Sequence, residues 1–369
     1  MLNDPRQYWV GFSLVKGIGA VRFQTLLDFF GRADIAWQAP AEALREAGLS
    51  ANLVENFLRL RASVNLEKIW DGILAQAIAV LTWEDPGYPR RLKEIAQPPP
   101  VLYLRGEVCP EDEWAVAIVG TRRVTAYGRQ VAEEVATTLA RSGVTIVSGL
   151  ARGVDGIAHQ AALNAGGRTL AILGSGVDRI YPPEHRRLSE GIIDVGALVS
   201  DYPPGTAPEA VNFPPRNRII SGLSLAVVVI EAGLSSGALI TASFAAEQGR
   251  DVFAVPGNIY APQSQGTNRL IRDGAFPLLD PNEILEALEL TMVNEHRAAR
   301  TVLPADALEA RLIELLSNEP LHVDEIRSKT ELPIEKVTAT LAMMELKGMV
   351  RQVGGMSYVA VRESRADYH

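Results

Sequence analysis

The sequence predicts an α/β protein built around a doubly wound, mostly parallel β-sheet. Short apolar runs alternate with segments of helical spacing in the central region, which is typical of a parallel sheet covered by helices. The chain up to residue 80 has only helical patterns, and the chain after the central region combines three helical segments with one hairpin. The expected parts are a helical domain (1–80), a linker with one short strand (81–113), the α/β core (114–290), a linker (291–304), a winged helix (305–361) and a tail (362–369).

Six apolar runs in the core are predicted to be strands that are buried on both faces. They are AVAIV (115–119), VTIVS (144–148), TLAIL (169–173), GALVS (196–200), LAVVVI (225–230) and DVFAV (251–255). Turns such as GTRR, GLARG and EAGLSSG follow these runs. Because the turns follow parallel strands, we expect them at the carboxyl edge of the sheet, where such folds bind ligands.

Residues 213–258 carry the clearest indication of a ligand. A helix is predicted over 237–249, and Ser235, Ser236 and Gly237 lie where the preceding strand turns into it. Free backbone N–H groups at such a position suit an anion. The segment begins with FPPRNR, which combines an aromatic ring with two guanidinium groups. The combination indicates a nucleotide or a phosphate-bearing polymer.

The N-terminal region is predicted to be all-helical, of the helix-hairpin-helix or SAM-like kind. SLVKGIGAVRFQTLLDFFG places a glycine hairpin between two helical runs. The backbone amides of such a hairpin can hold a DNA phosphate, but similar hairpins also occur in modules that only pack, and both interpretations stay open. One further helix is predicted over 53–76. A proline-rich, extended connection and the short strand VLYLRG follow it.

The C-terminal region is predicted to be a winged helix. A helix over 281–299 leads out of the core, and ALEARLIELL, LHVDEIRSKT and PIEKVTATLAMMELKGM then precede a hairpin that turns at Gly354 and Gly355. A winged helix usually binds DNA through the second helix of its helix-turn-helix pair. Residues 305–361 contain six Lys and Arg against nine Asp and Glu, so a contact with protein is an equally open interpretation.

Composition limits the class of protein. The net charge of −8 argues against non-specific coating of nucleic acid, so any such binding must be local. One cysteine, Cys109, excludes a disulfide framework and a thiolate metal cage, and no metal or cofactor is predicted. The first residues show no basic leader, and no apolar run approaches the roughly 18 residues of a membrane span. We therefore expect a cytoplasmic protein without membrane contact.

Two core turns carry candidate binding residues. IVGTRRVTAYG lacks the glycine spacing of a dinucleotide fingerprint and instead places Arg122 at the mouth of the crevice. SGLARGVDGIAHQAAL puts Asp155 and His159 on one helical face. The pair is either an acid and base, two metal ligands or, as the preferred interpretation, an orienting hydrogen bond under the loop. Ser148 and Gly149 are expected to offer backbone amides to a phosphate.

Three further side chains are candidates for the same crevice. Tyr181 and His185 either line one side of the pocket or belong to a proline-fixed loop over the sheet edge. Glu231 ends a predicted strand. It either acts on a sugar or base, or it forms an ion pair with Arg216 or Arg218. The sequence leaves these alternatives open.

Seven motifs occur together and in order: IVGTRRVTAYG, SGLARGVDGIAH, GSGVDRIYP, FPPRNRIISGLS, EAGLSSGALITA, VFAVPGN and QGTNRLIRDGA. With them, nearly the whole chain closely resembles the DNA-processing protein A (DprA/Smf) family. The resemblance implies a Rossmann-like core that binds and protects single-stranded DNA. It also implies a homodimer that loads the RecA recombinase onto incoming strands during natural transformation, without catalysis.

The resemblance further implies the residues of a DNA pocket. They are Gly120, Arg122, Ser148, Gly149, Phe213, Arg216, Asn217, Arg218, Ser236 and Gly237. Arginines and helix-end amides suit phosphates, and Phe213 can stack on a base without reading its identity. This role requires that Phe213 faces the pocket rather than the core, which the sequence leaves open.

One position differs from the family pattern. Family members often have a lysine shortly before the phenylalanine, whereas this chain has EAVN at 209–212. Arg186, Arg187 or Arg250 is an open replacement for that phosphate contact. No motif places the surfaces for dimerisation or for RecA by residue number.

A second function, from a different class, also stays open. Phosphoribohydrolases of the lysine-decarboxylase-like family share a glycine-rich Rossmann core and break the base–sugar bond with an acid near a PGG-x-GT-x-x-E element. This chain has AVPGN and EAGLSSGALITA but not that element, so the catalytic acid has no clear counterpart. Release of free base from nucleoside monophosphates would distinguish the two functions.

Overall fold

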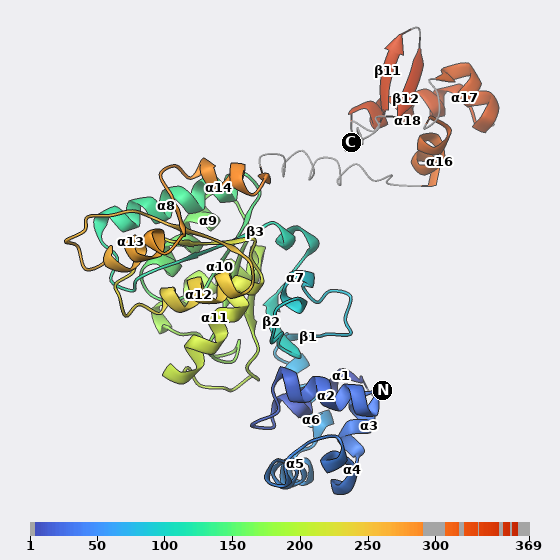
Figure 1. The fold of residues 1–369 in the computed structure, drawn as a ribbon. Helices are drawn as coiled ribbons and strands as arrows, with labels where there is room; N and C mark the ends of the chain where they lie inside the picture. Colours follow the sequence, from blue (N-terminus) through green and yellow to red (C-terminus); the bar gives the residue numbers. More distant parts are fainter. Residues whose placement is uncertain are drawn as a thin grey trace. The chain divides into compact units, whose positions relative to one another are not determined.

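The computed structural model describes residues 4–290, 307–316, 321–330, 332–346, 350–354 and 356–360. The chain divides into two compact units, Met1–Thr291 and Met292–His369 (Figure 1). Each unit has a hydrophobic core of its own. Within the described ranges, every helix is too short or too polar to cross a membrane.

The described part of the first unit contains a nine-stranded sheet with the order β1-β2-β6-β5-β4-β3-β7-β8-β9. The strands are β1 (Ala79–Thr82), β2 (Val101–Gly106), β3 (Ala115–Val119), β4 (Thr145–Ser148), β5 (Thr169–Ile172), β6 (Ala197–Ser200), β7 (Ala226–Val229), β8 (Asp251–Ala254) and β9 (Phe276–Pro277). All pairs from β6 to β9 are parallel, whereas β1 and β2 are antiparallel to their neighbours. The predicted mostly parallel sheet and its six core strands are confirmed.

The chain changes direction across the sheet at β3. From β3 it moves outward through β4, β5 and β6, and it then returns to the other side of β3 as β7 and β8. The helices of the first group are α8 (Ala126–Arg141), α9 (Val154–Asn164) and α10 (Arg186–Val195), and those of the second are α11 (Phe213–Gly222) and α12 (Ala238–Glu247). Loops diverge where the strand order reverses, so a crevice is expected beyond the carboxyl ends of β3 and β7.

The last helices of the first unit are α13 (Gln265–Arg272) and α14 (Asn282–Ala287). The helix predicted over 281–299 begins as α14, and its part from residue 291 onward lies outside the described residues. The helix predicted over 237–249 corresponds to α12.

The N-terminal region is helical, as predicted. Its helices are α1 (Arg6–Ser13), α2 (Ala20–Phe30), α3 (Ala33–Gln38), α4 (Ala41–Glu46), α5 (Ala51–Ser63) and α6 (Leu66–Leu74), and the glycine hairpin joins α1 to α2. The single helix predicted over 53–76 is wrong, because α5 and α6 are separate. The Asn65 side chain accepts the backbone N–H of Lys68 at 2.9 Å and thereby caps the start of α6.

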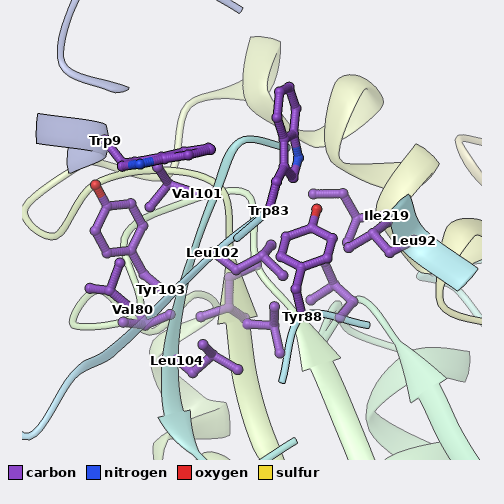
Figure 2. Close-up of a cluster of buried hydrophobic side chains, with 14 of the residues drawn as sticks. Trp9, Val80, Trp83, Tyr88, Leu92, Val101, Leu102, Tyr103, Leu104 and Ile219 are labelled. Carbon is purple, nitrogen blue, oxygen red and sulfur yellow. The ribbon is translucent and has the colours of Figure 1, made fainter. Parts of the chain in front are cut away.

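The connection after α6 contains more regular structure than its prolines indicated. Ala79–Thr82 forms the edge strand β1, which pairs with β2, and Arg90–Lys93 forms the short helix α7. Strand β2 is the predicted VLYLRG strand. Side chains of α1, β1, β2, α7 and α11 form one buried cluster, which includes Trp9, Leu102 and Ile219 (Figure 2). The helical region therefore packs directly on the antiparallel end of the sheet.

The described part of the second unit is the predicted winged helix. It contains α16 (Ala307–Leu316), β10 (Leu321–His322), α17 (Val323–Thr330), α18 (Ile334–Leu346), β11 (Val350–Gly354) and β12 (Ser357–Ala360), with the sheet order β10-β12-β11. Leu312, Ile326 and Leu341 belong to its core. The sequence did not indicate β10. Gly355 of the predicted turn lies outside the described residues, as do the predicted linker and tail.

Candidate nucleic-acid interface

An open cleft of about 750 Å³ lies at the carboxyl edge of the parallel strands. Its walls come from the turn after β3, the start of α9, the start of α11 and the turn that leads into α12. The residues that line it include Gly120, Arg122, Arg123, Asp155, Tyr181, Phe213, Arg216, Asn217, Ser235, Ser236 and Gly237. Seven of the ten predicted pocket residues are therefore brought together here.

Phe213 is half-buried and lines the cleft, so it does not belong to the core. The guanidinium carbons of Arg122 and Arg216 lie 5.6 and 5.8 Å from the centroid of its ring. The Tyr181 ring lies 5.9 Å away, centroid to centroid. Gly174 lies beneath, and a Cβ there would come within 2.8 Å of the phenyl ring. The ring is thus held in place and keeps an open side toward the cleft.

Arg216 forms part of the cleft floor and is only 4% exposed. Its Nη1 donates to the carbonyl oxygens of Gly149, at 3.0 Å, and of Ile172. Burial lowers the pKa of its guanidinium to about 10, so the group stays charged at neutral pH. Within the described part of the chain it forms no ion pair. The nearby carboxylate of Asp155 offsets part of this charge, and the guanidinium still lines the cleft.

Asp155 holds the loop after β4. One of its carboxylate oxygens accepts the backbone N–H groups of Gly149 and Ala151 at 3.2 and 3.3 Å. The preferred interpretation of Asp155 as an orienting residue is confirmed. Ser148 is buried and its Oγ donates to the carbonyl of Ile118 at 2.6 Å. Ser148 and Gly149 thus support the cleft from below, and the Gly149 amide is already engaged.

His159 is not the partner of Asp155. It is fully buried, and its Nδ1 lies 2.6 Å from Oγ1 of Thr169. Burial lowers the pKa of His159 to about 3, so the ring is neutral at physiological pH. Neither an acid–base pair nor a metal site is formed with Asp155. In the described ranges, no group of three or more His, Cys, Asp or Glu side chains is arranged to hold a metal ion.

Of the two residues proposed from GSGVDRIYPPEH, only Tyr181 lines the cleft. His185 lines a separate groove between α8 and α10, and its Nδ1 lies 2.9 Å from the carbonyl oxygen of Leu150. Tyr181 therefore lines the pocket, as one alternative predicted, and His185 packs in the loop, as the other alternative predicted.

Glu231 fulfils neither of its predicted roles. Its carboxylate accepts the backbone N–H of Thr125 at 2.9 Å and the Thr125 Oγ1 hydroxyl at 2.5 Å. The same hydroxyl accepts the N–H of Gly128 and caps α8. Glu231 is 3% exposed and joins the end of β7 to the start of α8. It forms no ion pair with Arg216 or Arg218, and it is not among the residues that line the cleft.

Arg218 does not reach the cleft. It lies two positions after Arg216 on α11, which corresponds to about 200° around a helix. Its Nη2 donates to Asp201 at 2.9 Å and its Nε donates to the carbonyl of Gln97 at 3.1 Å. Because these partners belong to the other side of α11, Arg218 stabilises that side.

The replacements considered for the family lysine also lie elsewhere. Arg250 donates to the carbonyl of Arg91 at 3.4 Å, and Arg186 and Arg187 are not among the residues that line the cleft. Arg123, which sequence reasoning passed over, does line it. Its position directly after Arg122 in the first turn was the only signal that could have indicated it.

The start of α12 provides the opposite wall. No atom lies within 4 Å of the position that a Cβ of Gly237 would take, so the backbone there is open. Asn217 donates to the Gly237 carbonyl at 3.2 Å and ties α11 to this turn. The first N–H groups of α12 are already engaged, because Ala238 donates to the Ser236 hydroxyl at 3.3 Å, and Leu239 and Ile240 donate to the carbonyls of Ser236 and Gly237 at 3.1 Å. The helix dipole still favours an anion at this end.

Charge and shape together limit the ligand. Among the described residues that line the cleft, three arginines face one acid, Asp155, although the whole chain carries −8. An aromatic ring between cations, opposite a helix N-terminus, suits bases and phosphates of an unpaired strand. The fold is that of a Rossmann-like α/β protein that also carries a winged helix, with an arginine-lined cleft at the carboxyl edge of its sheet.

Comparison with known proteins identifies the family. The model of DNA recombination-mediator protein A matches residues 79–289, and that of the DprA winged helix domain matches residues 296–356. Protein Smf of Synechocystis sp. is 38% identical over 395 residues, which cover 97% of this chain and 99% of the relative. The chain therefore belongs to the DNA recombination-mediator protein A family.

Two solved structures are similar to this chain. DNA processing protein A of Streptococcus pneumoniae has a TM-score of 0.67 and 32% identity, covering 76% of this chain and 97% of that one. DNA processing protein A of Helicobacter pylori has a TM-score of 0.52 and 32% identity, covering 57% and 95%. The latter structure concerns the single-stranded DNA binding mode of that protein.

Proposed function

We propose that this protein binds single-stranded DNA in the cleft and delivers the strand to the RecA recombinase during natural transformation. It acts as a cytoplasmic homodimer and catalyses no reaction. The observation that carries the proposal is the half-buried Phe213 ring in the cleft, with the guanidinium groups of Arg122 and Arg216 at 5.6 and 5.8 Å from its centroid. The single-stranded DNA binding mode of the H. pylori relative supports it.

The proposed contacts divide by chemistry. Arg122, Arg216 and the open backbone at Gly237 take phosphates, because they combine cations with a helix N-terminus. Phe213 stacks on a base, which gives affinity without sequence preference. The remaining proposed strand contacts are Gly120, Asn217 and Ser236. Ser148 and Gly149 act indirectly by holding the floor, and Arg218 acts by holding α11.

Hydrolysis of a base–sugar bond has no support in the cleft. Such a reaction needs a carboxylate that is free to act, but Asp155 and Glu231 both accept backbone N–H groups. We therefore expect no free base after incubation with nucleoside monophosphates. A measurable release would favour the phosphoribohydrolase alternative.

The binding experiment is fluorescence anisotropy with a labelled dT oligonucleotide of about 20 to 30 nucleotides, long enough to cover more than one cleft. Wild type is compared with Arg122→Ala and Phe213→Ala at two salt concentrations. Arg59→Ala and Phe29→Ala are matched controls, because both side chains are exposed on the N-terminal helices. Circular dichroism verifies that each variant is folded.

We expect both cleft variants to lose at least tenfold in affinity while the two controls bind as wild type does. Equal binding by all five proteins would contradict the cleft assignment. RecA loading is then tested by following RecA assembly on the bound strand, with the two cleft variants as negative controls. Assembly that is the same with and without wild-type protein would refute that step.

A further inference from the structure

A small cavity beside Phe213 brings together Arg122 and Arg216 of the cleft with Arg152, an arginine that does not line the cleft itself. The cavity has a volume of about 20 Å³, which is the size of a water molecule, and its lining includes Arg122, Arg152 and Arg216. The Tyr181 and Phe213 rings form part of the same lining. Arg152 comes from the loop between β4 and α9, so three separate segments bring cations to one point.

Arg152 differs from the other two arginines in what holds it. Its Nε donates to the carboxylate of Glu184, and the two side chains are 54% and 49% exposed. The pKa of Arg152 is raised, first by this carboxylate and to a smaller degree by the Tyr181 hydroxyl. Ion pairs at such exposed positions are weak, because water screens both charges. Glu184 can therefore be exchanged for another anion at little cost.

The positions of Arg152 and Glu184 indicate how a phosphate would replace the Glu184 carboxylate. Arg152 lines the small cavity, whereas Glu184 lines the neighbouring groove between α8 and α10. A phosphate that enters from the cleft would meet Arg152 in the small cavity, whose lining does not include Glu184. A guanidinium binds carboxylate and phosphate with the same planar set of N–H donors, so the two anions compete for it.

We propose that Arg152, in the small cavity next to the cleft, binds a DNA phosphate together with Arg122 and Arg216, and that Glu184 competes with this phosphate for it. This inference rests on the proposed binding of single-stranded DNA. It assigns the phosphate contact to Arg152, which shares a cavity with Arg122 and Arg216, whereas Arg186, Arg187 and Arg250 line neither that cavity nor the cleft.

The test is anisotropy with the same dT oligonucleotide over a series of salt concentrations. The proteins are wild type, Arg152→Ala, Glu184→Gln, the double variant and Arg59→Ala, which removes a similarly exposed arginine that pairs with Glu55. We expect Arg152→Ala to bind roughly three- to tenfold more weakly, with a slope of log K against log salt that is smaller by about 0.7. Glu184→Gln should bind roughly two- to fivefold more tightly.

The double variant separates competition from a general charge effect. If Glu184 acts through Arg152, the double variant binds as weakly as Arg152→Ala. If the gain from Glu184→Gln persists without Arg152, or if Arg152→Ala matches wild type in affinity and slope, the inference is overturned. Absence of binding by wild type would overturn the proposed function as well, so the two failures are distinguishable.

Discussion

Two regions of the first unit use the same residue types in opposite ways. Under the N-terminal helices, Trp9 and Tyr103 lie in one buried cluster (Figure 2). They are 2% and 0% exposed, and the Tyr103 hydroxyl shares a 2.7 Å hydrogen bond with Ser13. At the cleft, Phe213 is half-buried and its neighbours are cations. A ring that is completely covered contributes its whole area to folding, whereas a ring left open keeps area for a ligand.

The charges follow the same division. Arg218, on the side of α11 toward the N-terminal helices, is paired with Asp201 at 2.9 Å. Arg216, on the cleft side, donates to two backbone carbonyls and to Asn217, and it has no ion pair within the described residues. Burial, ring contacts and ion pairing thus distinguish the region that holds the protein together from the region that is available to bind.

The largest expected effect is on folding, from Trp9→Ala. Removal of this buried ring should lower the free energy of unfolding by about 3–5 kcal/mol, because a large cavity remains. Phe213→Ala should lower it by less than about 1 kcal/mol, because the ring is already partly in water. Urea denaturation followed by circular dichroism measures both. Equal losses of stability would erase the distinction between the two regions.

Two helical glycines sharpen the comparison. A Cβ at Gly128 would lie 2.3 Å from the buried carboxylate of Glu231, so Gly128→Ala should cost about 1–3 kcal/mol of stability. Gly72, in α6, has no atom within 4 Å of that position, and Gly72→Ala should stabilise by about 0.5–1 kcal/mol. Thermal unfolding of both variants would reveal opposite shifts. If Gly128→Ala leaves the stability unchanged, the Glu231 side chain can move away from the new methyl group, which would contradict this account.

The burial of His159 beneath the cleft predicts that the free energy of unfolding depends on pH. Its pKa falls from 6.5 to about 3 on folding, so the unfolded chain binds the proton more readily. The stability is therefore fully present above pH 6.5 and is lost as the pH falls toward 3, by about 2 kcal/mol at pH 5. His159→Gln should show a correspondingly smaller loss between pH 7 and 5 in urea denaturation. Identical pH profiles would refute this account of His159.

The smallest effect on binding is expected from Arg218→Ala. Because Arg218 lies outside the cleft and pairs with Asp201, the affinity for a dT oligonucleotide should change by less than about twofold. Arg216→Lys is the matched change inside the cleft, since it keeps the charge but loses the donors to Gly149 and Ile172. A loss with Arg218→Ala as large as with Arg216→Lys would place Arg218 in the binding site after all.

Most of the sheet could be predicted because buried parallel strands are continuous apolar runs between turn residues. Strand β1 was missed, since four residues at the edge of a sheet next to prolines carry little pattern. The break between α5 and α6 depends on one capping side chain, Asn65, inside an otherwise helical pattern. Such short-range details are decided by single hydrogen bonds and by packing against distant residues.

The candidate site was predictable to a similar degree. The motifs identified Arg122, Phe213 and the turn before α12, because residues at strand ends gather at one edge. The motifs could not show that Arg216 faces the cleft and Arg218 does not. That distinction depends on how α11 is rotated about its axis relative to the sheet. The motifs left two roles open for Glu231. In the structure it instead forms hydrogen bonds with Thr125, which lies 106 residues earlier in the sequence.

The most direct test of the central claim is photo-crosslinking of full-length protein to a single strand that carries 4-thiothymidine, followed by peptide mapping. The account predicts crosslinks in the peptides that contain Phe213 and Tyr181, which disappear when unlabelled single strand is added in excess. Crosslinks confined to the N-terminal hairpin or the winged helix, with none in the cleft peptides, would contradict it.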